Sequence, residues 1–98
     1  MDDRFEARAQ VWRYDGPAAW HFLSLPEAVS AEVKERFGMM SAGFGSLRVE
    51  ARIGATTWRT SIFYDRASGR YLLPLKADVR RAEGLAPGDE VAFVVTVS

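Results

Sequence analysis

The chain of 98 residues contains no cysteine and a single histidine, His21. Without cysteine there is no disulfide framework, no thiolate nucleophile and no zinc site built from thiolates. One imidazole also excludes a metal site made of several histidines, and no acidic cluster has the spacing of a calcium loop. We therefore predict neither a metal nor a cofactor.

Long apolar runs are missing as well. No stretch approaches the roughly 20 apolar residues that span a bilayer, and the acidic start Met1-Asp2-Asp3-Arg4 differs from the basic start of a signal peptide. These features predict a cytoplasmic protein with no membrane contact. A chain of this length, 48% hydrophobic, is long enough for one core but not for two. We predict one β-barrel domain over residues 1–98.

The chain as a whole has no net charge, but its middle has an excess of positive charge. Thirteen basic residues balance thirteen acidic ones, whereas residues 40–81 carry eight basic residues and three acids. Clustered positive charge attracts anionic partners, so this segment is a candidate anion-binding face. The simpler interpretation is that these arginines are solvated or paired across strands.

Six segments show the apolar alternation or the β-branched and aromatic content of strands. They are separated by turn residues such as Asp15-Gly16-Pro17 and Ser68-Gly69. In the fourth segment either face has bulky residues, and a bulge midway would resolve the ambiguity. Pro74 in the fifth favours an edge position or a strand end. The segments are 5–11, 19–23, 47–53, 56–64, 71–75 and 91–97.

Two segments have helical spacing and end signals. Pro26 suits a first helical position, and Val29, Val33 and Phe37 recur every fourth residue, which predicts a helix over about 26–37. Gly38 is expected to end it in the left-handed conformation. A shorter helix is predicted over about 76–83, with Gly84 as its terminator, and residues 38–46 form a glycine-rich loop.

This order of elements predicts a mainly β fold. The last strand is apolar on both faces, as in a closed or doubly covered sheet, and should pair with the first. We predict a small six-stranded Greek-key-type β-barrel with two short α-helices, because closure removes exposed strand edges. An open α+β sheet is the alternative. The predicted core comprises Val49, Ile53, Ile62, Leu73, Val91, Phe93 and Val95.

Catalytic motifs are scarce. Neither Ser46 nor Ser61 lies in a Gly-x-Ser-x-Gly elbow, and His21 sits within an apolar strand. The acids lie on a solvated helix face, on an outward strand face or in turns, not as a pair in one cleft. We predict no catalytic residues. Whether the protein is an enzyme stays open, although the residues favour a protein without enzymatic activity.

Four strings carry a resemblance to a known family: Gly43–Val49, Trp58–Phe63, Tyr71–Arg80 and Gly88–Val91. Together they resemble the bacterial family named domain of unknown function 1905. The resemblance implies a small Greek-key-type barrel, alone or fused ahead of a domain of the bacteriocin-protection or outer-membrane-protein-associated type, and it implies no activity. Residues 73–91 are also similar to the half-motif of swapped-hairpin transition-state regulators and double-psi barrels, some of which bind DNA.

A candidate ligand site follows from the expected hairpins. Glycines let a ligand approach the backbone, and an indole, two arginines and a hydroxyl could recognise a planar or anionic group beside them. The residues proposed for this site are Gly43, Phe44, Gly45, Trp58, Arg59, Ser61 and Arg80.

Three functions remain open from the sequence. The first is a non-catalytic binding or accessory module for a small, possibly anionic, ligand or for a protein partner. The second is a nucleic-acid-binding barrel that uses residues 40–81 and aromatic neighbours such as Trp58. A small enzyme is the third.

Overall fold

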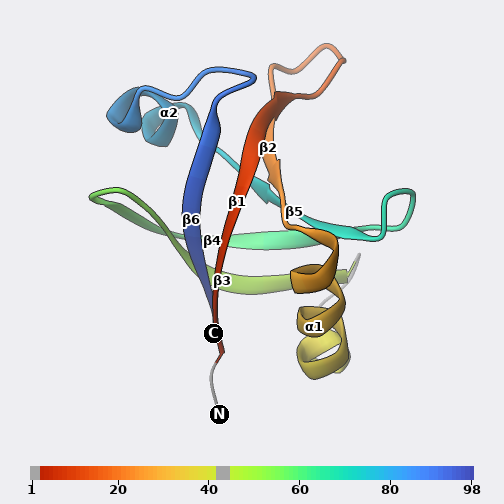
Figure 1. The fold of residues 1–98 in the computed structure, drawn as a ribbon. Helices are drawn as coiled ribbons and strands as arrows, with labels where there is room; N and C mark the ends of the chain where they lie inside the picture. The colour runs from red at the N-terminus through yellow and green to blue at the C-terminus, as the bar shows by residue number, and fades with distance from the viewer. Residues whose placement is uncertain (1–2, 42–44) are drawn as a thin grey trace.

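The computed structural model describes residues 3–41 and 45–98 (Figure 1). No helix in these ranges is long and apolar enough to cross a membrane. In chain order the elements are β1 (Arg4–Arg13), β2 (His21–Ser24), α1 (Glu27–Phe37), the 3-10 helix η1 (Gly38–Met40), β3 (Ser46–Ile53), β4 (Thr56–Asp65), β5 (Arg70–Pro74), α2 (Ala77–Glu83) and β6 (Glu90–Val97).

The six strands close into one barrel in the order β1-β2-β5-β4-β3-β6, and every neighbouring pair is antiparallel. Val95 of β6 pairs with Phe5 on one side and Ala51 on the other, so the last strand joins the first and closes the sheet. The predicted mainly β, six-stranded barrel is confirmed, and the open-sheet alternative is wrong. Its Greek-key designation stays a prediction.

Alternate residues of each strand point into the barrel. All seven predicted core residues are buried, together with Phe5, Val11, Leu23 and Tyr71. In β4 the inward set is Trp58, Thr60, Ile62 and Tyr64, whose side-chain positions alternate with the more exposed Arg59 and Phe63. The bulge considered for this strand is absent, because the β3–β4 register runs without interruption from Ser46↔Phe63 to Ile53↔Thr56.

Helix α1 covers the end of the barrel near the termini (Figure 1). Val33 is buried in the core, and the Phe37 ring meets Phe5 edge-on at 6.2 Å. Ser30 adds a polar link, because its Oγ accepts the Tyr71 backbone N–H at 3.0 Å and donates to the Leu25 carbonyl at 3.2 Å. Helix α1 is therefore fixed to β5 as well as to the core.

The predicted left-handed ending at Gly38 is wrong. Gly38 has φ −58° and ψ −33°, and its N–H still bonds to the Lys34 carbonyl. The right-handed path therefore continues into η1 before the chain leaves the helix.

Helix α2 lies at the opposite end, near the β1–β2 loop (Figure 1). The Thr56 hydroxyl donates to the Glu83 carboxylate at 2.6 Å, which ties α2 to the start of β4. Gly84 ends the helix with φ 64°, the left-handed conformation that glycine adopts without a Cβ clash. Pro74 is the last residue of β5, as its missing N–H predicts.

Candidate functional site

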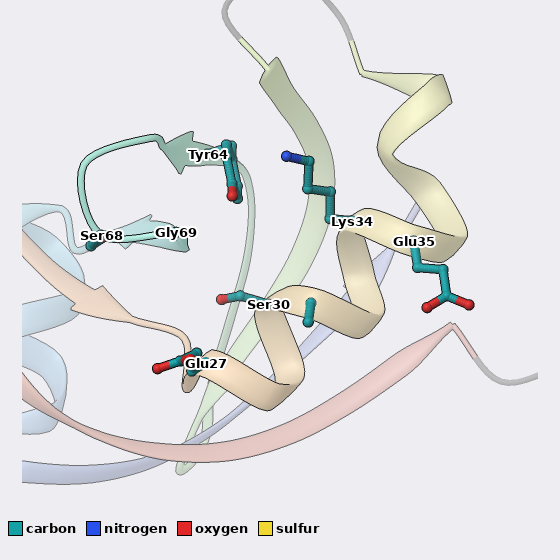
Figure 2. Close-up of a pocket in the computed structure, with 8 residues that line it drawn as sticks. Glu27, Ser30, Lys34, Glu35, Tyr64, Ser68 and Gly69 are labelled. Atoms are coloured by element: carbon teal, nitrogen blue, oxygen red, sulfur yellow. The ribbon is translucent and has the colours of Figure 1, made fainter.

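Two adjoining pockets lie between α1 and the turn that joins β4 to β5, and Figure 2 shows the one that contains Glu27. They share Lys34 and Tyr64. The Glu27 pocket, of about 490 Å³, is lined by Glu27, Ser30, Ala31, Lys34, Glu35, Tyr64, Ser68 and Gly69. The Arg66 pocket, of about 710 Å³, is lined by Lys34, Gly38, Ser41, Gly45, Tyr64, Arg66 and Tyr71.

The local structure explains why these side chains meet. Tyr64 and Tyr71 are cross-strand partners beside the β4–β5 turn. Tyr64 has the inward phase of β4, but it stands near the strand end, where α1 covers the barrel. Lys34 lies on the exposed side of α1, one residue after buried Val33, and its side chain extends toward Tyr64 in Figure 2.

Lys34 and the two tyrosines form a compact cluster. The Lys34 Nζ lies 4.1 Å from the centre of the Tyr64 ring, and the Tyr64 and Tyr71 rings are 5.2 Å apart in an edge-on arrangement. A cation over an exposed aromatic ring gains about 0.5–1 kcal/mol. This contact holds the ammonium at the wall that the two pockets share.

Tyr71 is the buried member of the cluster. Burial raises the pKa of its phenol above the ordinary value, and the nearby Tyr64 raises it further, whereas a side-chain hydrogen bond with Ser41 acts in the opposite direction. The phenol therefore stays protonated at neutral pH. Tyr71 thus contributes a neutral phenol to the lining of the Arg66 pocket.

The two pockets differ in charge. Within the described ranges, the lining of the Arg66 pocket has two cations, Lys34 and Arg66, and no acidic residue. The Glu27 pocket adds two glutamates, Glu27 and Glu35. No three His, Asp or Glu side chains in the described part of the chain form a group that could hold a metal ion. The Arg66 pocket thus combines positive charge with hydroxyl groups.

The sequence profile of the family described as "Domain of unknown function (DUF1905)" matches residues 7–95, nearly the whole chain. The chain belongs to the DUF1905 family. Among curated proteins, no sequence matches this DUF1905 domain. The family description assigns no activity, so any role rests on the geometry of the site.

Among the residues proposed from the sequence, those that the structure describes lie on different faces and at different ends of the DUF1905 barrel. Gly45 lines the Arg66 pocket, whereas Gly43 and Phe44 lie outside the described residues. Trp58 points inward and is partly buried, and its Nε1 has no hydrogen-bond partner among the described atoms.

The polar members of the proposed site lie elsewhere. Arg59 and Ser61 face outward, where the Ser61 hydroxyl accepts a hydrogen bond from Arg48 at 3.3 Å. Arg80 lies at the α2 end and donates to the Leu75 carbonyl at 3.2 Å. Ligand binding by this set stays a prediction.

The basic middle segment does not form one face either. Arg66 lines a pocket at the α1 end, whereas Lys76 and Arg80 line another beside α2. Arg59 is the cross-strand partner of Glu50 on the outer wall, and Arg81 is paired with Asp78. The cations that are close in sequence are therefore distributed over both ends and the side of the barrel.

Sequence reasoning missed Lys34, Ser41, Tyr64, Arg66 and Tyr71. Part of the signal was present, because a hairpin closed by the 65–70 turn pairs Tyr64 with Tyr71. The contribution of Lys34 depends on how α1 docks against that hairpin, and no local pattern reports docking.

Proposed function

We propose that this DUF1905 domain is a non-catalytic binding module whose ligand is a small anion held in the Arg66 pocket. One observation carries the proposal: Lys34 and Arg66 line a single pocket, and none of the described residues in its lining is acidic.

The donors available there suit an anion. Lys34 and Arg66 supply charged N–H groups, and charge-assisted hydrogen bonds are stronger than neutral ones. The hydroxyls of Ser41 and Tyr71 line the same pocket, together with Gly45, where no side chain obstructs the backbone. A ligand with several oxygens, such as a phosphate or carboxylate group, can accept hydrogen bonds from both cations, beside the Ser41 and Tyr71 hydroxyls that share a hydrogen bond with each other.

The same residues give little support to catalysis. Lys34 and Arg66 suit the binding of an anion, whereas the described residues of the pocket lining include no carboxylate or imidazole, the commonest general bases. His21, the single histidine of the chain, is buried at the opposite end of β5, and its Nδ1 lies 2.9 Å from the Ala19 carbonyl. We therefore favour binding over turnover.

Calorimetric titration with inorganic phosphate tests the proposal. We expect phosphate to bind the parent, and Lys34→Ala to weaken the affinity about tenfold or more, because it removes a charged hydrogen bond. Lys34→Arg should retain most of the affinity. Phosphate that fails to bind, or that binds Lys34→Ala as tightly as the parent, refutes the proposal.

The matched control is Arg59→Ala, which removes an exposed cation from the outer face of β4. It should leave phosphate affinity within about twofold of the parent. Arg59 does not line the Arg66 pocket, and solvent and salt screen its exposed charge. A loss with Arg59→Ala and none with Lys34→Ala would favour the site proposed from the sequence.

A further inference from the structure

A second feature, at the other end of the barrel, is a row of aromatic rings on the outer surface. Trp12 and Phe22 are cross-strand partners, with ring centres 5.0 Å apart. Trp20 continues the row and stacks on Phe22 at 6.0 Å with an angle of 15° between the rings. None of the three points into the core, because the inward positions are taken by Val11, His21 and Leu23.

Trp20 is the exposed end of this row. Its residue is 53% exposed, although water contact of an indole forfeits the gain from burial. Its position is nevertheless well fixed. The backbone N–H of Trp20 donates to the Ala18 carbonyl at 2.9 Å, and the backbone carbonyl of Trp20 accepts the Tyr14 backbone N–H at 2.8 Å.

The rest of the row is anchored too. The Trp12 Nε1–H donates to the Ser24 hydroxyl at 2.9 Å, which fixes the first ring under Phe22. A flat group that stacks on Trp20 therefore meets a surface already in place, and binding to a preorganised surface costs little conformational entropy.

A small pocket adjoins this indole. The Trp20 pocket, of about 220 Å³, is bounded by Trp20, His21, Pro74, Lys76 and Arg80 together with Leu75 and alanines. It is smaller than the roughly 300–1,000 Å³ that buries a whole drug-sized ligand, so it accommodates one ring system with the remainder of the ligand outside.

The charge of this pocket is positive. Among the described residues its lining has Lys76 and Arg80 and no acidic side chain, and the nearby Asp78 is paired with Arg81. The bond from Arg80 Nε to the Leu75 carbonyl, 3.2 Å long, holds that guanidinium at the pocket wall. A neutral sugar would stack on the indole but would not use these two cations.

We propose that the Trp20 pocket binds a nucleobase that carries a phosphate, with the base stacked on Trp20 and the phosphate facing Lys76 and Arg80. Base stacking on an aromatic side chain tolerates any base, because every base has a π face. The phosphate supplies the negative charge that the cations attract. The same group occurs in a free nucleotide and in a single-stranded nucleic acid, and the proposal does not depend on the Arg66 pocket.

Titrations with adenosine monophosphate and with a short oligothymidylate test this inference. We expect Trp20→Ala to weaken binding about tenfold or more, since one base–aromatic stack contributes roughly that factor. Tyr14→Ala is the matched control, because Tyr14 is the other exposed aromatic residue of this loop and does not line the pocket. It should change the affinity less than about twofold, as expected of a side chain outside the contact.

The phosphate contact has its own pair of variants. Lys76→Gln should weaken oligothymidylate binding and reduce its salt dependence, because fewer counterions are released, whereas Arg81→Gln should do neither. Binding of both probes would identify the nucleotide unit as sufficient, and binding of the oligothymidylate alone would identify a single strand as the ligand.

Two outcomes overturn the inference: neither probe binds, or Trp20→Ala binds as tightly as the parent. Trp20→Phe keeps a ring and should retain part of the affinity. In the parent itself, the NMR resonance of the Trp20 indole N–H should shift when either probe saturates the protein. A resonance that does not move also refutes the inference. Lys34→Ala should leave that shift unchanged, so failure here is distinct from failure of the anion site.

Discussion

Ser30 shows how one small polar residue can position a site. It is 1% exposed, and its hydroxyl bridges Leu25, before α1, to Tyr71 of β5. The Leu25 N–H also bonds to the Tyr71 carbonyl at 2.8 Å. Because Lys34 lies one helical turn after Ser30, this bridge sets the position of the Lys34 ammonium over Tyr64.

We expect Ser30→Ala to lower the free energy of unfolding by about 1–3 kcal/mol, because the buried Tyr71 N–H loses its acceptor. Urea denaturation measures the effect. The matched control is Ser68→Ala, whose hydroxyl bonds to Asp65 in an exposed turn and whose loss should change the stability by about 0.5 kcal/mol or less. Equal losses in the two variants would contradict the role assigned to the buried hydroxyl.

At the scale of elements, the strands and helices could be predicted because their signals are local. Apolar residues alternate in 47–53 because one face of that strand packs against the core. Val29, Val33 and Phe37 recur every fourth residue because one face of that helix packs there too. The orientation of β4 was ambiguous, since Trp58 and Phe63 are both bulky and only strand pairing decides which turns inward. The ending at Gly38 was mispredicted because glycine permits the left-handed conformation without requiring it.

Two glycines at helix ends make this distinction measurable. Gly84→Ala should cost about 1–2 kcal/mol of stability, because φ 64° places a Cβ against the backbone although no other atom lies within 4 Å. Gly38→Ala should raise stability by about 0.4–1 kcal/mol, since its φ of −58° suits alanine and the unfolded chain loses freedom. Thermal and chemical denaturation report both signs.

A loss of stability in Gly38→Ala would show that the new Cβ, 3.4 Å from the Lys34 Cγ, is not accommodated. A neutral Gly84→Ala would contradict the left-handed ending of α2. The opposite signs of the two stability changes thus distinguish Gly84, where the backbone conformation requires glycine, from Gly38, where it only permits glycine.

At the scale of the whole molecule, barrel closure decides which residues become neighbours. Arg66 and Arg80 are close in sequence, yet β5 carries the chain from one end of the barrel to the other between them. Lys34 and Tyr64, which are far apart in sequence, meet at the α1 end. The fold could therefore be predicted from local patterns, whereas the site required the closed topology, and a charge excess along the chain did not mark a face.

Closure also concentrates stability in the barrel interior, which one buried and one exposed phenylalanine of the sheet can test. Phe93 of β6 is 2% exposed, and Phe63 on the outer face of β4 is 39% exposed. We expect Phe93→Ala to cost about 3–5 kcal/mol, a large part of the roughly 5–15 kcal/mol that stabilises a domain, because it leaves a cavity in the core. Phe63→Ala makes the same chemical change but should cost about 1 kcal/mol or less, since it loses cross-strand contacts with Leu72 and Ser46 at an exposed position. Denaturation midpoints compare the two, and a Phe93→Ala midpoint equal to that of the parent would contradict the assignment of this strand to the core.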